Sequence, residues 1–543
     1  MELAPRPSPP DVSASARAAV PTSATPAVLP VLLPGMLGVL LYAVTVPGTF
    51  VYDDVLLLML DERLGPQIDW LAYLTDGYHH GVDNLYRPLT SLSFALQYRF
   101  AGLTAWPYHL VNVLLYGGCC GMVAATAGRL ARLLGTRRTA SKTPGINPPT
   151  VALLAGLLFA VHPVHVEAVA GIYGRAELLC TLFMLAAVWL AAAAPSPWRL
   201  AAILAAVVLA VASKEQGMLT PAVLGLLGLA AWRRGLFPLP DTDGRRRHKL
   251  LAALLMLFLA AYVVWRETIL RFWWPREFLD AVKQPFAAAD GLDRWLLPFS
   301  VLGRAAATLL WPARLSIDYG QAVITPDVTP GDVYLWLGAL TLLAGLAAGI
   351  LAWRRRNWLV LFSLAATAVV WAPAANVLTL VGTPFGDRLL FLPSAFLAIA
   401  TATLLARLPR RGLMALLALL LTAGAVRTLD YALAWRDRLT LYEAVVAAQP
   451  KSVMNRQLLA EELARRGQFD EARAQAGEAI KLAPWYPNAY YTAAAVELYA
   501  GDLAAAERFL AAGAVYDVSM MQMGISHQIE RARAGEPMPT LAE

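Results

Sequence analysis

The chain has 543 residues, of which 58% are hydrophobic and only 15% are charged, whereas a soluble domain carries about 25% charged residues. The net charge of +7 comes from basic residues in short loops between apolar runs, so it marks membrane topology and excludes nucleic-acid binding. These features exclude a soluble globular protein and predict a polytopic membrane protein.

The amino-terminal residues 1–28 are rich in Pro, Ala and Ser, and we expect them to form a disordered cytoplasmic tail. An uncleaved first span follows, because no short apolar core with a good cleavage site appears. Apolar runs long enough to cross a bilayer as helices then recur along the chain. The predicted spans lie at roughly 29–50, 108–128, 150–165, 177–195, 199–213, 217–232, 249–266, 332–353, 358–379, 388–406 and 412–431.

Basic clusters mark the cytoplasmic side of these spans. They fall at 129–142, 233–249, 354–356 and 407–411. Spacing them consistently requires eleven crossings, with the amino terminus inside and the carboxyl terminus outside. The loops 51–107 and 267–331 and everything after about residue 432 are then exoplasmic.

The first exoplasmic loop begins with two adjacent carboxylates, Asp53 and Asp54. Side by side at the end of an apolar span, their like charges should raise one pKa, which suits a general base or a metal ligand. Two solvated loop acids are the alternative. His79 and His80 could bind phosphate or a metal, or could be surface histidines. Arg87 follows in the segment YRPLT.

Five ionisable residues lie within sixteen positions in the turn after the third predicted span. Ionisable residues at membrane depth are costly and are candidates for function. A His-x-x-His followed by Glu could hold a metal, but phosphate or carbohydrate binding fits the mixture of Arg and His better. The five are His162, His165, Glu167, Arg175 and Glu177.

Two later turns carry charges on the same side. Lys214 and Glu215 connect two spans, and Arg388 begins another. Each could be a snorkelling anchor at a helix end. Together they surround one exoplasmic surface with cations, as the phosphate of a membrane-embedded lipid would require. Between these turns, residues 295–312 are nearly long enough to span, but a Pro and an Arg interrupt them, so we predict a re-entrant or interfacial helix.

The carboxyl-terminal region repeats with a period of 34 residues. Pro450 and Pro484 are 34 apart, as are Gly467 and Gly501. This is the period of tetratricopeptide repeats, in which helix pairs stack into an α-solenoid. A plain helical hairpin domain is the alternative. The fold predicted for the whole chain is therefore all-α, with a transmembrane domain at 29–431 and an exoplasmic repeat domain at 432–543.

Five segments in this order resemble the TMTC family, the transmembrane and tetratricopeptide-repeat O-mannosyltransferases. They are YRPLTSLSFAL, FAVHPVHVEAVAGIYGRAELL, SKEQGM, LLWPARLSIDYG and GDRLLFLPS. The resemblance covers about residues 35–520 and implies a GT-C glycosyltransferase that uses a polyprenyl-phosphate sugar and inverts the anomeric centre. The family usually carries more repeats than this chain does. The composition, rich in Ala, Leu and Arg, suggests a bacterial homologue located in the inner membrane, with its repeats in the periplasm.

The resemblance also implies roles for the charged residues. Asp53 is expected to be the base on the acceptor hydroxyl, with Asp54 as its supporting group. For the donor, the resemblance carries over only the positions of the motif residues. From their charge, we expect Arg175, Lys214 and Arg388 to hold the phosphate of a lipid-linked sugar donor, with His162 and His165 close by. The whole donor set is Arg87, His162, His165, Glu167, Arg175, Glu177, Lys214, Glu215 and Arg388.

The expected reaction moves mannose or another hexose to a hydroxyl of a protein or glycan acceptor held by the repeats. No cofactor is assigned, and a divalent metal is not favoured because Arg and Lys can neutralise a monophosphate. Two other classes stay open. A transporter or lipid flippase would line a pathway with the intramembrane charges, and a non-catalytic scaffold would use only its repeats.

Overall fold

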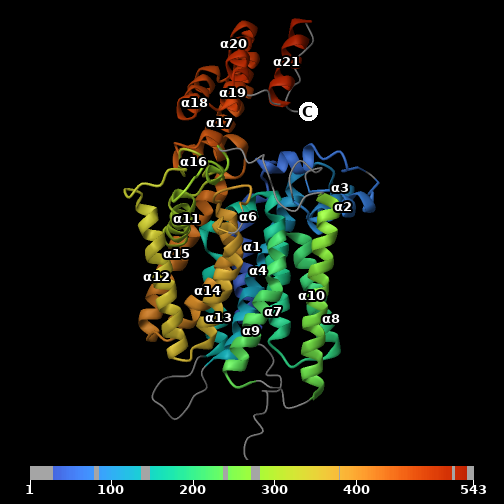
Figure 1. The fold of residues 1–543 in the computed structure, drawn as a ribbon, viewed down its shortest axis with the longest axis vertical. Helices are drawn as coiled ribbons and strands as arrows, with labels where there is room; N and C mark the ends of the chain where they lie inside the picture. Colours follow the sequence, from blue (N-terminus) through green and yellow to red (C-terminus); the bar gives the residue numbers. More distant parts are fainter. Residues whose placement is uncertain are drawn as a thin grey trace, which may run out of the picture.

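The computed structural model describes residues 28–65, 67–78, 85–135, 147–236, 242–270, 282–377, 380–516 and 520–534. Within these ranges the chain consists of helices and short helical turns, without strands, which confirms the predicted all-α fold. Long helices stand side by side in a bundle, and the carboxyl-terminal helices stack above one end of it (Figure 1). The predicted tail lies, up to residue 27, outside the described residues.

Each of the eleven predicted spans coincides with a helix or with a helix and its adjoining turn. Seven helices in the described ranges are long and apolar enough to cross a membrane, or eight if one bent pair counts as a single span. The bent pair is α5 (Pro148–Ala160) followed by η4 (Pro163–His165) and α6 (Val166–Ala170). The seven are α4 (Ala105–Leu134), η5 (Ile172–Gly174) with α7 (Arg175–Ala191), α10 (Thr242–Leu270), α12 (Val333–Arg354), α13 (Trp358–Trp371) with η8 (Ala372–Ala375), η9 (Asp387–Leu390) with α14 (Phe391–Leu405), and α15 (Arg410–Ala434).

Of the eleven predicted spans, three therefore correspond to helices shorter than the length used to recognise a membrane-spanning helix. The three remaining helices are α1 (Leu29–Tyr42), α8 (Pro197–Ser213) and α9 (Thr220–Arg233), with 14, 17 and 14 residues. Proline residues and polar turns end the helices of this bundle. Pro163 separates α5 from α6 with a bend of 58°, because proline cannot continue the hydrogen-bond ladder of a helix.

Helices α10, α12 and α15 turn most of their apolar residues outward. Only 11%, 11% and 6% of their most apolar windows are buried inside the protein. A soluble protein rarely exposes apolar patches of this size, whereas such surfaces are stable against lipid tails. The structure thus agrees with the composition, and the chain is an integral membrane protein.

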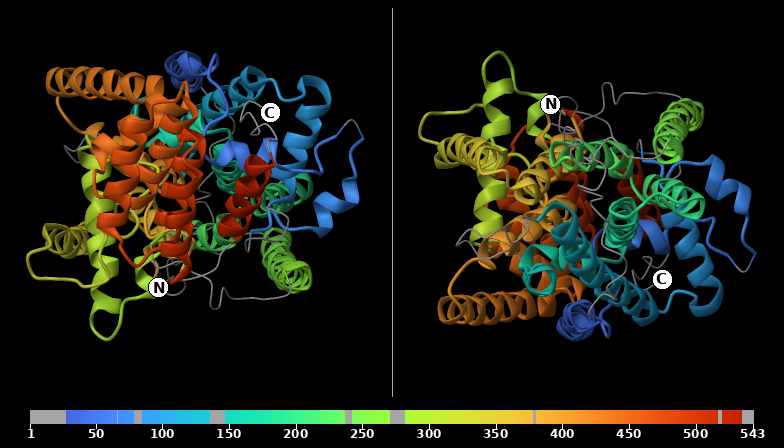
Figure 2. Two further views of the ribbon diagram at one scale, coloured as in Figure 1. Left: turned by 90° about the horizontal axis from the view of Figure 1, so that it is seen from above. Right: turned by 90° about the horizontal axis from the view of Figure 1, so that it is seen from below.

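Residues 295–312 form the larger part of α11 (Asp293–Leu310), an amphipathic helix with Pro298 inside it. Seen from above, α11 lies lengthwise across the bundle, whereas α12 is seen end-on (Figure 2). The two backbones meet at Gly303 and Gly338, where an added Cβ would lie 1.9 Å and 1.8 Å from the other helix's carbonyl oxygen. The placement of this helix as re-entrant or interfacial stays a prediction.

The carboxyl-terminal helices follow the 34-residue period. Helix α17 (Val453–Arg465) recurs as α19 (Pro487–Ala500), and α18 (Phe469–Leu482) recurs as α20 (Leu503–Ala514). Gly467 and Gly501 join the helices of each pair with φ of +75° and +81°, a conformation that glycine adopts at little cost. Helices α16 (Arg438–Ala448) and α21 (Met520–Arg533) flank the two pairs. The tetratricopeptide assignment itself stays a prediction.

The stacked helices rest on the end of the bundle that also carries α2 (Trp70–Thr75) and α3 (Pro88–Ala101) (Figure 1). The Thr49 N–H donates to the carbonyl of Arg436 over 3.0 Å. The Ser452 hydroxyl donates to Asp318 over 2.6 Å. The segment after α1, the segment around Asp318 and the repeat helices therefore meet at one end of the molecule.

Candidate active site

The two adjacent carboxylates have different surroundings. Tyr52 has a φ of +51°, so the chain turns sharply just before Asp53 and Asp54. The Asp54 side chain is fully buried, and its two oxygens accept the N–H groups of Tyr173 over 2.9 Å and Val51 over 3.2 Å. The Asp53 side chain is 34% exposed. Only Asp53 is thus open to a reacting molecule.

Arg388 joins Asp53 to Glu167. Its Nη1 lies 3.4 Å from Asp53 Oδ2 and 3.3 Å from Glu167 Oε1, and its backbone N–H donates to Glu167 Oε2 over 2.8 Å. Tyr173 completes the group, because its hydroxyl donates to Glu167 over 3.1 Å and its ring lies 4.9 Å from the guanidinium carbon. We call Asp53, Glu167, Tyr173 and Arg388 the Asp53 cluster. Glu167 is buried, whereas Arg388 is 24% exposed.

A second group of charges lies where two motifs meet. Lys214 Nζ lies 2.6 Å from Glu177 Oε1, and both side chains are buried. Arg87 Nη2 lies 3.0 Å from Glu215 Oε2, and the Thr90 hydroxyl donates to the carbonyl of Ser213 over 2.9 Å. We call Arg87, Glu177, Lys214 and Glu215 the Lys214 cluster. The segments YRPLT and SKEQG therefore contact each other.

Tyr78 is within electrostatic reach of both clusters, and its ring centre lies 4.9 Å from the guanidinium carbon of Arg87. Burial raises the pKa of its phenol above the ordinary value, and Arg87, Glu177, Asp53 and Glu215 all act on it electrostatically. Next to it, burial alone would raise the pKa of Glu215, but the charge of Arg87 lowers it below the ordinary value. The sequence-predicted carboxylates and cations thus share one region at the repeat-bearing end of the bundle.

Arg175 is nearly fully buried and is held by neutral groups. Its Nε donates to Asn112 over 3.0 Å and its Nη2 to the carbonyl of Tyr108 over 3.2 Å. The guanidinium carbon also lies 4.5 Å from the centre of the Phe94 ring. These contacts tie α7 to α3 and α4, so they give Arg175 a structural use in addition to the predicted one.

The histidines of the same turn contact protein groups. His165 is buried, with Tyr116 Oη 3.0 Å from Nδ1 and Ser394 Oγ 2.8 Å from Nε2. His162 accepts the Val164 N–H at Nδ1, so its Nε2 is free to donate to the carbonyl of Leu309 over 3.0 Å. These are the contacts of histidines that hold a fold together. No group of three or more His, Cys, Asp or Glu suited to a metal ion occurs in the described part of the chain. His79 and His80 lie outside the described residues.

Three residues next to the site were not among the predicted site residues. Asp387 is buried and accepts the Ser316 N–H over 3.0 Å and the Tyr319 hydroxyl over 2.8 Å. Asp318 accepts the Ser452 hydroxyl of the repeat helices. The motifs LSIDYG and GDRLL contain Asp318, Tyr319 and Asp387. In the sequence, polar residues among apolar ones were the only indication that these positions belong near the site. They connect the repeat helices to the residue beside Arg388.

The buried Asp54 predicts how stability depends on pH. Burial raises its pKa from 3.8 to about 8, against the lowering effect of the two N–H groups. The folded protein then holds a proton that the unfolded chain releases, so the free energy of unfolding falls as pH rises from about 4 to about 8. The slope from this group is at most about 1.4 kcal/mol per pH unit. Thermal unfolding across this range should show a shallower slope for Asp54→Asn, and equal slopes would contradict the assignment.

Fold and site together define a polytopic helical membrane protein with ionised residues at one end, beneath stacked helix pairs. Comparison with curated proteins gives some relatives that match a short part of the chain and others that match most of it. The frog Xenopus laevis protein O-mannosyl-transferase tmtc2 is 39% identical over 160 residues, which cover 28% of this chain and 17% of the relative. The protein O-mannosyl-transferase Tmtc3 of Drosophila melanogaster is 28% identical over 498 residues, or 80% of this chain and 53% of the relative. F38B6.6 of Caenorhabditis elegans, another protein O-mannosyl-transferase by name, is 26% identical over 462 residues, or 83% of this chain and 62% of the relative.

The curated homologues of the chain are thus TMTC protein O-mannosyl-transferases, which confirms the resemblance seen in its motifs. The chain spans about half the length of the fly relative, 53%. These relatives are animal proteins and give no support to the suggested bacterial origin. No family model matches the chain, and no solved structure matches it.

Proposed function

We propose that the protein is an inverting glycosyltransferase that moves a sugar, mannose or another hexose, from a polyprenyl-phosphate donor to a Ser or Thr hydroxyl of a protein. The observation that carries the proposal is the ion pair between the partly exposed Asp53 and Arg388, 3.4 Å apart, at the end of a membrane bundle. The names of the homologues as protein O-mannosyl-transferases support the reaction class.

The base in this proposal is Asp53. A general base must lie within hydrogen-bond reach of the proton that it removes, and Asp53 has the exposure for this. Asp54 lacks the exposure, because its side chain is fully buried, and burial raises the pKa of its carboxyl to about 8. Asp54 instead holds the backbone at Val51 and Tyr173, which fixes the direction of its neighbour.

Arg388 is the proposed partner of the donor phosphate. The acceptor oxygen attacks the anomeric carbon, the bond from that carbon to the phosphate oxygen breaks, and the phosphate leaves with the bonding electrons. The acceptor proton passes to Asp53. A guanidinium stabilises the charge that develops on the phosphate, and Glu167 holds this guanidinium from its buried side over 3.3 Å. The inverted product follows from a single displacement.

We place this chemistry on the exoplasmic face. Support comes from the basic residues Arg354, Arg355 and Arg356, which lie at the end of α12 opposite to the end near the repeat helices (Figure 1). Basic loops favour the cytoplasmic side. The repeat helices would then hold the acceptor polypeptide outside, above the Asp53 cluster.

A transfer assay tests the proposal. Purified protein, mixed with isotopically labelled polyprenyl-phosphate mannose and a Ser/Thr-containing peptide, should produce labelled peptide with the inverted anomeric linkage. A nucleotide sugar should not replace the donor. EDTA should leave the rate unchanged within about twofold, because Arg388 takes the place of a metal ion at a monophosphate. Absence of transfer from every lipid-linked hexose, with folded protein, would overturn the proposal.

A further inference from the structure

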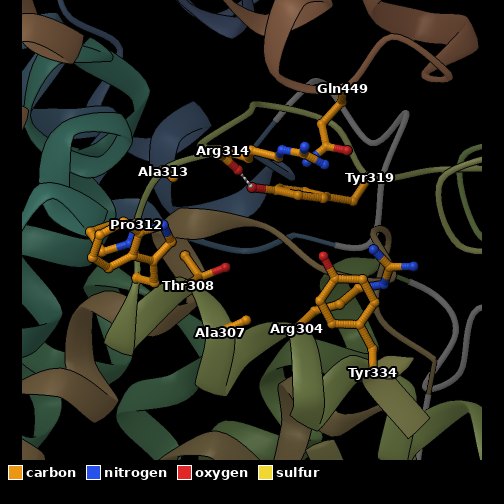
Figure 3. A pocket seen from close by; sticks show the side chains of 10 residues that line it. Arg304, Ala307, Thr308, Pro312, Ala313, Arg314, Tyr319, Tyr334 and Gln449 are labelled. Atoms are coloured by element: carbon orange, nitrogen blue, oxygen red, sulfur yellow. Dashed lines mark hydrogen bonds between the residues drawn. The ribbon is translucent and has the colours of Figure 1, made fainter. Parts of the chain in front are cut away.

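A pocket lies on the same side of the molecule as the repeat helices, and none of its lining residues belongs to the Asp53 or Lys214 cluster. It has a volume of about 310 Å³ and lies between α11, the first turn of α12, the segment 311–319 and Gln449 after α16. Figure 3 shows Tyr319 in its middle, with Arg314 and Gln449 on one side of the ring and Arg304, Thr308 and Tyr334 on the other.

The charge of this pocket is positive. Arg304 and Arg314 line it, and no carboxylate does. The Arg304 guanidinium lies 4.1 Å from the centre of the Tyr334 ring and donates to the carbonyl of Val323 over 2.8 Å. Its Nε is buried without a hydrogen-bond partner. Within the described part of the chain neither arginine forms an ion pair, so a bound anion would offset the cost of burying Arg304.

The residues around this pocket are of the types that gather at a membrane interface. Trp311 lines it, and both Trp311 and its neighbour Leu310 are 79% exposed. Tyr334 lies in the first turn of α12, whose apolar residues beyond it face outward. Trp and Tyr gather where the hydrocarbon meets the head groups. The two arginines therefore lie at the depth of lipid phosphates.

We propose that this pocket binds a phosphate ester supplied by the head group of an anionic membrane lipid, at a site separate from the Asp53 cluster. Guanidinium groups bind phosphate with paired, charge-assisted hydrogen bonds, and the exposed Trp311 and Leu310 would contact the start of the acyl chains. The Tyr319 hydroxyl donates to Asp387, next to Arg388. An occupied pocket thus holds the segment that reaches toward the Asp53 cluster.

Lipid binding to the full chain in nanodiscs tests this site without any transfer reaction. Phosphatidic acid is titrated into phosphatidylcholine discs, and retention on the protein is measured by native mass spectrometry together with thermal unfolding. We expect the apparent affinity for phosphatidic acid to fall about tenfold or more in Arg304→Gln/Arg314→Gln. Arg508→Gln removes one exposed charge from α20 and should leave the affinity unchanged.

Exposed Arg314 provides a second variant in case the double variant does not fold, and Arg314→Gln alone should still weaken retention. Equal retention by the wild type and the folded variants would overturn the proposal. Two other results would also contradict a lipid source. In one, inorganic phosphate displaces phosphatidic acid at equal concentration. In the other, an acidic peptide raises the melting temperature of the protein in neutral discs, and Arg314→Gln abolishes that effect.

Discussion

Replacement of Asp53 by Asn is expected to lower kcat/KM for sugar transfer by about 10²–10⁴-fold, the usual contribution of a positioned base. The amide keeps the size of the carboxylate but cannot accept the acceptor's proton. The fold should survive, because Asp53 is 34% exposed and its ion pair with Arg388 is long, at 3.4 Å. Such exposed pairs contribute at most about 1 kcal/mol, and Glu167 remains as the partner of Arg388.

Three measurements distinguish the loss of a base from a loss of folding or of donor binding. Asp290→Asn, in the segment before α11, removes an exposed carboxylate and should leave the rate unchanged. The melting temperature of Asp53→Asn should stay near that of the wild type. Binding of the donor should not weaken, because the cation at Arg388 is retained. A folded Asp53→Asn protein with the wild-type rate would exclude Asp53 as the base and would require another residue in that role.

The membrane fold could be predicted from the sequence because its signals are local. A run of apolar residues defines a helix in lipid wherever it lies in the chain, and the period of 34 residues brought α17 and α19 into register without knowledge of their contacts. The count of eleven spans stays a prediction. Helices α1 and α9 have 14 residues each, and composition does not separate such short helices from those long enough to cross a membrane.

The candidate site was predicted only in part, because its partners are remote in sequence. Asp53 and Arg388 are 335 positions apart, and no periodicity reports such a pair. Their charges at the ends of apolar spans brought both to attention without pairing them. The burial of individual side chains could not be predicted from the sequence either. His165 was expected close to the donor phosphate, and the sequence did not show that its ring would pack against Phe159 and Phe391. Asp387 adjoined a predicted residue, yet its bond to Tyr319 depends on a segment 68 positions away.

The second large effect concerns Lys214. Its Nζ lies 2.6 Å from Glu177 Oε1, and the two side chains are 7% and 4% exposed. Lys214→Met would leave a carboxylate buried without its cation, which typically costs about 3–5 kcal/mol. We expect the free energy of unfolding to fall by this amount, seen as a lower melting temperature and a lower yield of folded protein.

The double variant Lys214→Met/Glu177→Gln separates a structural role from donor binding. Removal of both charges of a buried pair is often close to neutral, so the double variant should regain most of the stability lost in Lys214→Met. Its KM for the lipid donor then decides the role. We expect a KM within about twofold of the wild type, because Glu177 already occupies the ammonium group. A restored melting temperature together with a KM raised tenfold or more would show instead that Lys214 contacts the donor phosphate, and that Glu177 only holds the lysine in place until the donor arrives.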